Sequence, residues 1–384
     1  MARKKIATDG SSSNGEDSVL NDILVDSLNK KLGDVAYILG KGDSPPEVKE
    51  WLSTGSTVLD TIVSNDATAD GGIPVGRLTE ICGEAATGKS LLSYMILKDC
   101  QDKGGIPVLI DTENAANEDF LQLLGLKFYP EGSLVYIQVD SVEKVFSAIE
   151  EIIRKIKEND KDKLCCIVWD SVAGTSTDAE IQNDYGEATI GMQARMIGQG
   201  LRKLIRFIGK QRVALVFLNQ VRQKIGVFFG DDTVTPGGKA IPFFSSVRMK
   251  LYSGGKVKTG KDVIGVGIKP KLIKNRMGPP HREAELKMYF SRGLIDEESW
   301  LDELLKSGVA DKVSVQKSSI TNKDTGEVYE FQNRKFVDWI RDPANAEAHA
   351  YCKVKVKEGL VIEQDPFNRE EEAVVEDLVG EEEL

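Results

Sequence analysis

The sequence has few of the residues from which metal centres and disulfide frameworks are built. It contains two histidines, His281 and His349, which is little material for a histidine metal site or a histidine-based catalytic triad. Its five cysteines are odd in number and form no C-x-x-C pair, which argues against disulfide frameworks and zinc ribbons. Free cysteines fit a reducing compartment, so we expect a cytoplasmic protein.

Long apolar runs are also missing. No stretch approaches the ~18 apolar residues that a membrane-spanning helix needs, so we expect no membrane association. The start of the chain, MARKKIATDGSSSNGEDS, is basic but contains no apolar segment, unlike a secretory signal peptide. The composition, 41% hydrophobic and 29% charged over 384 residues, is that of a soluble protein with two or three domains.

The net charge of −11 is concentrated at one end. Residues 370–384 carry eight acidic groups and no basic one, and removing these eight charges leaves −3 for the rest. This tail is either a solvated terminus or an intramolecular competitor for a basic surface. Overall acidity does not exclude nucleic-acid binding, because local basic patches decide it.

The organisation along the chain follows from periodicity and composition. A helix is predicted over residues 18–40, because leucines recur every four residues after a potential N-capping Ser18. A linker with Gly and Pro separates it from the rest, so its apolar stripe must pack on its own domain or on the next subunit. We expect a disordered N-terminus (1–17), this helix and linker (18–50), a core (51–292), a small α+β C-terminal domain (293–368) and an acidic disordered tail (369–384).

The core alternates between strand and helix patterns, which indicates an α/β fold with a mostly parallel twisted sheet flanked by helices. Continuous apolar strands such as Leu164–Trp169 are typical of a sheet covered on both faces. After Arg248 the sequence becomes β-rich. The predicted strands are Arg77–Cys82, Pro107–Ile110, Ser133–Val139, Leu164–Trp169 and Arg212–Gln220, and the predicted helices are Ser90–Lys103, Val142–Glu158 and Met192–Ile208.

A phosphate-binding loop is predicted at GEAATGKS, which fits G-x-x-x-x-G-K-[ST] between a strand and a helix. Its glycines let main-chain N–H groups face an anion, and the helix adds its positive N-terminus. Lys89 would reach the β and γ phosphates, and the Ser90 hydroxyl would bind Mg²⁺. The predicted nucleotide-binding residues are Gly83, Glu84, Ala85, Ala86, Thr87, Gly88, Lys89 and Ser90.

Polar residues follow the other strands. Asp170 ends an apolar strand, where an acid that holds magnesium is expected. Glu113, just past another strand, could orient or deprotonate water, although on spacing alone a surface acid is also possible. Asn219 and Gln220 precede a long loop with basic, aromatic and Gly-Gly elements. Such a loop is functional or disordered, and this one is predicted to bind anions.

Together these motifs resemble those of the RecA/RadA recombinases, most closely the bacterial RecA type. The similarity runs from about residue 51 to 295 and includes STGSTVLD, GGIPVGRLTEICG, GEAATGKS, LIDTENA, IVWDSVAG, GMQARM, FLNQVRQKIGVFFG, PGGKA and KLIKNR. The resemblance implies a RecA-like P-loop core with ATP and Mg²⁺ as cofactors. It also implies a DNA-dependent ATPase that forms helical filaments on single-stranded DNA, pairs it with homologous double-stranded DNA and exchanges strands in recombination and repair.

The resemblance also implies roles for single residues around ATP. Lys89 and Ser90 match the Walker A pair, Asp170 the Walker B acid, and Glu113 the carboxylate that activates water. Asn117 and Phe120 match adenine contacts, and Gln220 matches the γ-phosphate sensor. Lys274 and Arg276 match cations that reach ATP in the neighbouring protomer, although solvated surface cations remain an alternative.

For DNA, the resemblance implies a first loop at 184–191 and a second at 222–239, and a helix at 18–39 that docks on the adjacent subunit. The implied phosphate contacts are Arg195, Arg202, Arg222 and Lys224, with main-chain donors at Gly237 and Gly238 and apolar wedges at Ile190 and Ile225. Mediator proteins are a further expected partner.

Departures from the bacterial pattern, at residues 84–87 and after about residue 293, suggest a divergent member such as one encoded by a bacteriophage. Two alternatives remain open. A RecA-core motor or regulator, such as a ring helicase or mediator, would share the Walker residues but lacks the paired DNA loops and KLIKNR. A non-hydrolysing DNA-binding filament is disfavoured, because Lys89, Glu113 and Asp170 are all present.

Overall fold

A computed structural model describes residues 14–33, 35–39, 41, 48–183, 191–209, 211–223 and 233–362. The chain divides into two compact units, residues 1–49 and 50–384. Most of the predicted disordered N-terminus and all of the predicted acidic tail lie outside the described residues. Within the described ranges, none of the helices combines the length and hydrophobicity that a bilayer span requires.

The first unit contains one helix in its described part, α1 (Asn14–Leu32). It begins four residues before Ser18, so the prediction of Ser18 as the N-cap was wrong. It also ends earlier than predicted, because Gly33 takes a left-handed φ of +80° and the Asn29 carboxamide accepts hydrogen bonds from the N–H groups of Val35 and Ala36. The leucines of the stripe are exposed by 43–61% in the isolated chain.

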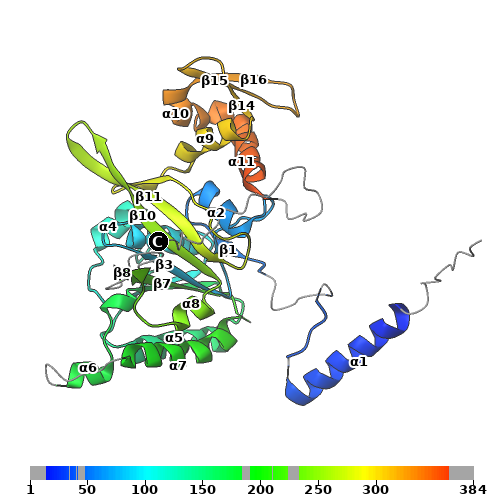
Figure 1. Ribbon diagram of the computed structural model, residues 1–384, viewed down its shortest axis with the longest axis vertical. Coiled ribbons are helices and arrows are strands. Elements are labelled where there is room, and N and C mark those ends of the chain that lie inside the picture. Colours follow the sequence, from blue (N-terminus) through cyan, green and yellow to red (C-terminus); the bar gives the residue numbers. More distant parts are fainter. Residues whose placement is uncertain are drawn as a thin grey trace, which may run out of the picture. The chain divides into compact units, whose positions relative to one another are not determined.

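The second unit is built on a nine-stranded sheet in its described part (Figure 1). From β10 to β5 neighbouring strands run parallel, whereas β10 to β13 pair antiparallel, so the predicted α/β fold is confirmed. In spatial order the strands are β13 (Gly293–Leu294), β12 (Leu286–Tyr289), β11 (Asp262–Asn275), β10 (Val247–Thr259), β3 (Leu78–Gly83), β7 (Val213–Gln220), β6 (Cys165–Asp170), β4 (Ile106–Asp111) and β5 (Val135–Gln138).

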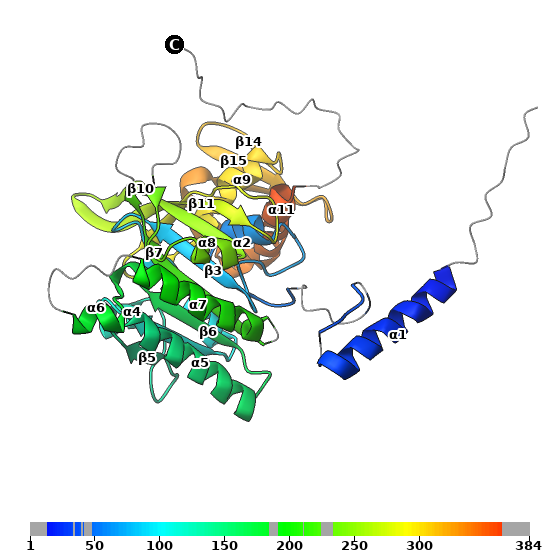
Figure 2. The same cartoon turned by 60° about the horizontal axis from the view of Figure 1, so that its bottom comes forward.

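Helices α5 (Val142–Asn159) and α7 (Met192–Ile208) lie side by side on one face of this sheet (Figure 2). Apolar side chains at helical spacing form the buried stripe of each helix, as the sequence pattern predicts. Ser141 caps α5 by accepting a hydrogen bond from the Lys144 N–H at 3.3 Å. The buried residues of α7 begin at Ile197, so this helix packs on the sheet from its second turn onward.

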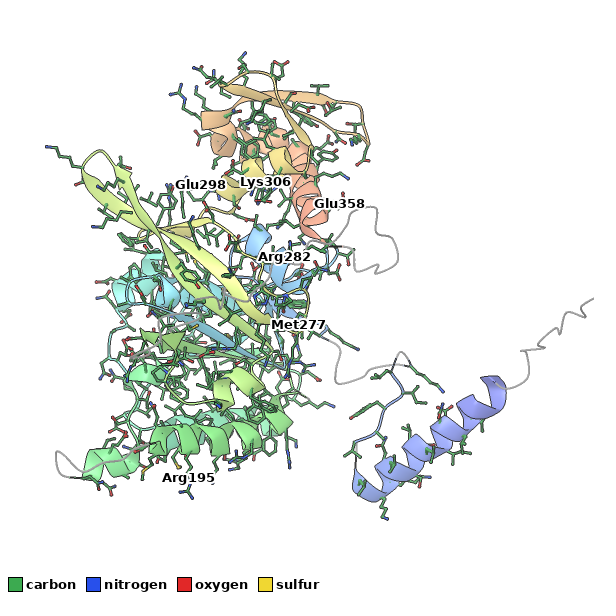
Figure 3. All side chains as sticks on the ribbon, viewed as in Figure 1. Arg195, Met277, Arg282, Glu298, Lys306 and Glu358 are labelled. Atoms are coloured by element: carbon green, nitrogen blue, oxygen red, sulfur yellow. The ribbon has the colours of Figure 1, made fainter. Side chains whose placement is uncertain are left out.

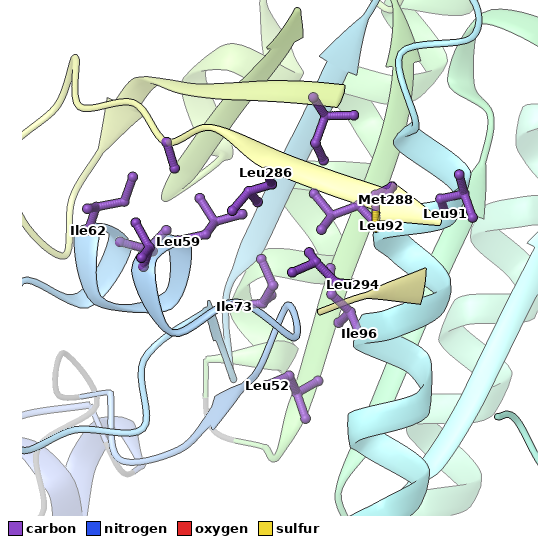
Figure 4. Packing of buried hydrophobic residues seen from close by; sticks show 14 of the residues in the cluster. Leu52, Leu59, Ile62, Ile73, Leu91, Leu92, Ile96, Leu286, Met288 and Leu294 are labelled. Carbon is purple, nitrogen blue, oxygen red and sulfur yellow. The ribbon is translucent and has the colours of Figure 1, made fainter. Parts of the chain in front are cut away.

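The other face is covered by α2 (Thr57–Ser64), α3 (Lys89–Asp102) and α4 (Glu118–Leu123). Figure 4 shows how this layer packs together segments that are far apart in the sequence. The short strands β1 (Trp51–Leu52) and β2 (Ile73–Pro74) pair beside it. Its buried side chains include Leu52, Leu59, Ile62, Ile73, Leu92, Ile96, Leu286, Met288 and Leu294.

The C-terminal part combines an antiparallel sheet with helices, as expected for a small α+β segment. Because β13 belongs to the large sheet, that sheet extends two residues past the predicted boundary at 292. The Asp296 carboxylate accepts hydrogen bonds from the N–H and hydroxyl of Thr57, which fastens this segment to α2. The elements are η2 (Asp296–Ser299), α9 (Trp300–Lys306), β14 (Ala310–Lys312), β15 (Lys317–Thr321), β16 (Val328–Gln332), α10 (Phe336–Ile340) and α11 (Ala346–Leu360).

Candidate functional site

The loop between β3 and α3 is the predicted phosphate-binding loop. Gly88 has a φ of +85°, and a Cβ on Gly83 would lie 2.6 Å from the Leu251 carbonyl oxygen, so both positions require glycine. Among the described residues, the N–H groups of residues 85–88 donate to no main-chain or side-chain acceptor. Free N–H donors at a helix N-terminus are the arrangement that binds phosphate.

Lys89 and Ser90 begin the helix that follows. Lys89 Nζ donates to the carbonyl oxygens of Gly83 at 3.1 Å and Glu84 at 2.6 Å, and burial lowers its pKa. Ser90 Oγ donates to Asp170 Oδ2 at 2.7 Å, although the two residues are 80 positions apart. The hydroxyl and the carboxylate are therefore close enough to bind one cation together, and both are oxygen ligands of the kind that Mg²⁺ prefers.

Asp170 stands at the end of β6, in register with Asp111 at the end of β4. Burial raises the pKa of Asp170 to about 6, and the nearby carboxylates of Glu113 and Asp111 act in the same direction. Asp111 was not predicted as a site residue. Its carboxylate accepts hydrogen bonds from the N–H groups of Glu113 and Ala116 and from the Tyr136 hydroxyl, so it orders the loop that carries Glu113.

The Glu113 side chain is exposed, and one of its two carboxylate oxygens accepts hydrogen bonds. Its Oε1 accepts hydrogen bonds from the Ser171 hydroxyl and, at 3.4 Å, from Gln220 Nε2. Gln220 is in register with Gly83 at the start of the phosphate loop. The structure thus brings Glu113 and Gln220 together beside the loop, while their roles stay predictions. Ser171, which sequence reasoning missed, directly follows the predicted Walker B acid in IVWDSVAG.

The two predicted adenine contacts share the first turn of α4. Asn117 Oδ1 caps this helix by accepting a hydrogen bond from the Phe120 N–H at 3.0 Å. Asn117 Nδ2 donates to no described residue and remains available for a ligand. The Phe120 ring lies edge-to-face against Tyr94, with ring centroids 6.5 Å apart. The side-chain oxygen of Asn117 is therefore already used to cap α4.

Lys274 and Arg276 lie on β11 and contact the end of α8 (Ala240–Phe244). Lys274 Nζ donates to the carbonyl oxygens of Pro242 at 2.7 Å and Phe243 at 2.9 Å, and Arg276 Nη2 reaches the latter at 3.4 Å. Within the described part of the chain, neither cation contacts the phosphate loop or Glu113 of the same protomer. Their predicted role toward a neighbour stays a prediction.

The predicted DNA-contacting residues fall partly within the described structure. Ile190, Lys224 and Ile225 lie outside it. Arg195, which projects outward from α7 in Figure 3, is exposed, as are Arg202 on α7 and Arg222 on β8 (Arg222–Gln223). Strand β8 pairs with β9 (Thr233–Val234) to form the stem of the second loop, and α6 (Asp178–Gln182) precedes the first loop.

The end of the second loop returns to the start of α7. Gly237 and Gly238 have φ values of +89° and +71°. A Cβ on Gly238 would lie 2.7 Å from the Ala194 Cβ, so the loop backbone lies directly against this helix. Asn219 Nδ2 also donates to the Pro236 carbonyl oxygen at 3.0 Å, which ties the loop end to β7. Both predicted DNA loops therefore end at the first turns of α7.

Comparison with known proteins agrees with this arrangement. The family model for the RecA N-terminal domain matches residues 19–295. The chain is 36% identical to RecA of Thermus aquaticus over 287 residues, 74% of this chain and 80% of that protein. It is 32% identical to RecA of Bifidobacterium breve over 361 residues, 92% of this chain and 87% of that protein, so similarity extends past residue 295. The chain therefore belongs to the RecA family of ATP-dependent recombinases, the DNA-dependent ATPases of recombination and repair.

Proposed function

We propose that this chain hydrolyses ATP at the edge of the sheet formed by residues 83–90, Glu113 and Asp170, and couples hydrolysis to strand exchange in a filament on single-stranded DNA. The observation that carries the proposal is the 2.7 Å hydrogen bond between Ser90 and Asp170 with Glu113 beside them. The N–H donors for phosphate, two oxygen ligands for one cation and a carboxylate base therefore lie at one place.

Each group has a separate task. The free N–H groups of residues 85–88 and the Lys89 ammonium bind the phosphates of the substrate ATP. Ser90 and Asp170 would hold Mg²⁺, which neutralises phosphate charge when bound. Glu113 orients the attacking water and accepts its proton on Oε2, because Ser171 and Gln220 already occupy Oε1.

The site requires a second protomer. Glu113 is exposed in the single chain, and the Lys274 and Arg276 side chains donate to carbonyl oxygens of their own α8. In a filament these cations would reach the ATP of the next protomer and stabilise the charge that develops on its phosphates. The exposed leucine stripe of α1 would dock on the adjacent subunit. Filament assembly and hydrolysis are then linked, since assembly completes the site.

DNA binding would use the loops and α7. Arg195, Arg202, Arg222 and Lys224 neutralise phosphates, which gives affinity without sequence preference, as a homology search requires. Gly237 and Gly238 supply main-chain donors, and Ile190 and Ile225 separate groups of bases. Mediator proteins that load the filament are part of the same proposal.

Joint-molecule formation tests this function. The protein is mixed with ATP, single-stranded DNA and homologous supercoiled double-stranded DNA, with Lys89→Ala as the matched variant. We expect joints that require both ATP and homology and that are lost in the variant. DNA-stimulated ATP hydrolysis without joints, over a range of magnesium and salt concentrations, would favour the motor or mediator class instead.

A further inference from the structure

One side chain joins the start of α7 to the turn that follows the Walker B strand. Gln193 Nε2 donates to the Val172 carbonyl oxygen at 3.0 Å and to the Thr175 carbonyl oxygen at 2.8 Å. These carbonyls bracket the 3-10 turn η1 (Val172–Gly174). Both N–H bonds of one amide are therefore used to hold this turn against the helix.

The same turn packs directly against the Glu113 side chain. A Cβ on Gly174 would lie 2.9 Å from Glu113 Cγ, so the turn backbone directly contacts this side chain. The Ser171 hydroxyl, just before the turn, donates to Glu113 Oε1, and Thr175 Oγ1 donates to Thr112 Oγ1 at 2.9 Å. A shift of the turn must move the Glu113 carboxylate.

Both predicted DNA loops end beside the first turns of α7, the helix that carries Gln193. The first loop ends at Gly191, the N-cap of α7, two residues before Gln193. Near the end of the second loop, a Cβ added to Gly237 would lie 3.1 Å from Ile197 Cδ1 of α7 and 3.3 Å from Val172 Cγ1 of the turn. Because this packing is close, displacement of either loop end is passed to α7 or to Val172.

We propose that Gln193 is a positioning residue through which DNA on the loops sets the position of Glu113, an inference that rests on the proposed function of Glu113 and of the loops. Binding of DNA at the loop ends moves the first turn of α7. The Gln193 amide transmits this movement to residues 172–175, and the turn carries Glu113 into place for hydrolysis. Gln193 itself contacts neither nucleotide nor DNA in this role.

The test uses Gln193→Glu, which keeps the size of the side chain but removes both donors, and Gln193→Ala. ATP turnover is measured without DNA and with saturating oligo-dT, together with the KM for ATP and the Kd for oligo-dT. We expect the stimulation by DNA to fall about tenfold, a normal size for coupling between sites. Turnover without DNA, the KM and the Kd stay near those of the wild type. Gln199→Ala, an exposed glutamine on the same helix, is the control and keeps full stimulation.

The outcomes separate this inference from the proposed function. Full stimulation in both Gln193 variants overturns the coupling role and leaves the proposed function standing. Equal loss of turnover with and without DNA, loss of oligo-dT binding, or early thermal unfolding of both variants also overturns it, because the amide would then serve catalysis, binding or folding. Wild-type turnover in Glu113→Gln would instead overturn the proposed function, whatever the Gln193 variants do.

Discussion

Gln220 Nε2 lies 3.4 Å from Glu113 Oε1, so the last residue of β7 faces the carboxylate proposed to activate water. Gln220 also stands at the root of the predicted second DNA loop, two residues before β8. The site and the loop thus share one backbone segment. In the proposed function, hydrolysis would depend on a carboxylate whose partners come from the Walker B turn on one side and from the root of a predicted DNA loop on the other.

Replacing Glu113 with Gln should strongly reduce ATP turnover while leaving nucleotide binding intact. The amide oxygen can still accept from Ser171 and Gln220, so the local geometry is retained, but the amide cannot take a proton from water. We expect ATP turnover to fall by ~10²–10⁴-fold, the usual contribution of a positioned base. Phosphate release and nucleotide binding are the measurements, with Glu118→Gln on α4 as the control. Loss of ATP binding in Glu113→Gln would contradict the assigned role.

Lys274→Ala should reduce DNA-stimulated turnover without unfolding the chain. The side chain donates to two carbonyl oxygens at the end of α8, and loss of such hydrogen bonds costs ~1 kcal/mol each. Lys269→Ala, an exposed position on the same strand, serves as the control. Turnover equal to that of the wild type would remove the argument for a site between protomers.

Mixing Lys274→Ala with Glu113→Gln distinguishes action on a neighbour from action within one chain. Each variant alone should show reduced DNA-stimulated turnover. If Lys274 acts on the next protomer, about a quarter of the interfaces in an equal mixture combine an intact Glu113 with an intact Lys274. Turnover should therefore recover in the mixture. No recovery in mixed filaments would show that both residues serve the same protomer.

The Walker elements could be predicted from the sequence because each is a local pattern. Lys89 and Ser90 follow from the Gly-rich loop, and Asp170 from its place at the end of an apolar strand. The contacts of Gln193 could not be predicted in this way. They join a helix start to a turn 18–21 positions earlier in the sequence, and only the packing of α7 on the sheet brings them together.

Helix ends and competing hydrogen bonds account for other differences. The leucine spacing predicted α1, but the spacing alone did not show that residues before Ser18 continue the helix or that Gly33 ends it. Asn117 was assigned to adenine by resemblance, yet its oxygen caps α4. Asn and Ser side chains can bond to several nearby main-chain groups, and the surrounding backbone, which a sequence pattern does not specify, decides which bond forms.

Arg248→Ala should destabilise the fold far more than loss of a surface ion pair. Arg248 Nε donates to Glu80 Oε2 at 2.5 Å, and the Glu80 side chain is fully buried in β3. Glu80 Oε1 also accepts a hydrogen bond from Asn219 Nδ2 at 3.0 Å. Removing Arg248 leaves a buried carboxylate without its cation, a change that costs ~3–5 kcal/mol.

The matched control for this prediction is Lys269→Ala. Lys269 pairs with Glu285 at 2.5 Å, but the two side chains are 47% and 75% exposed, so the loss should be ~1 kcal/mol or less. Urea unfolding of both variants gives the comparison. Equal losses in the two variants would mean that the burial of Glu80 does not set the strength of its pair.

Asp60 should make the stability of the fold depend on pH. It is buried in α2, where its carboxylate accepts hydrogen bonds from Ser53 Oγ and from the N–H and hydroxyl of Thr54. Burial outweighs these bonds and raises the pKa of Asp60 to about 7, with the nearby Asp296 acting in the same direction. The folded state therefore holds this proton over a range in which the unfolded chain has released it.

The sign of the effect follows from that difference. Below about pH 4 both states are protonated, and stability is constant with respect to this group. As the pH rises from about 4 to about 7, unfolding releases the proton that the folded state still holds, so the free energy of unfolding falls by up to ~1.4 kcal/mol per pH unit. Asp60→Asn, which resembles the neutral acid, should lose this slope. Urea unfolding of both proteins from about pH 4 to above pH 8 should give curves that diverge as the pH rises and run parallel above about pH 8. Parallel curves throughout would mean that Asp60 is already ionised in the folded state at low pH, held by its hydrogen bonds against the effect of burial.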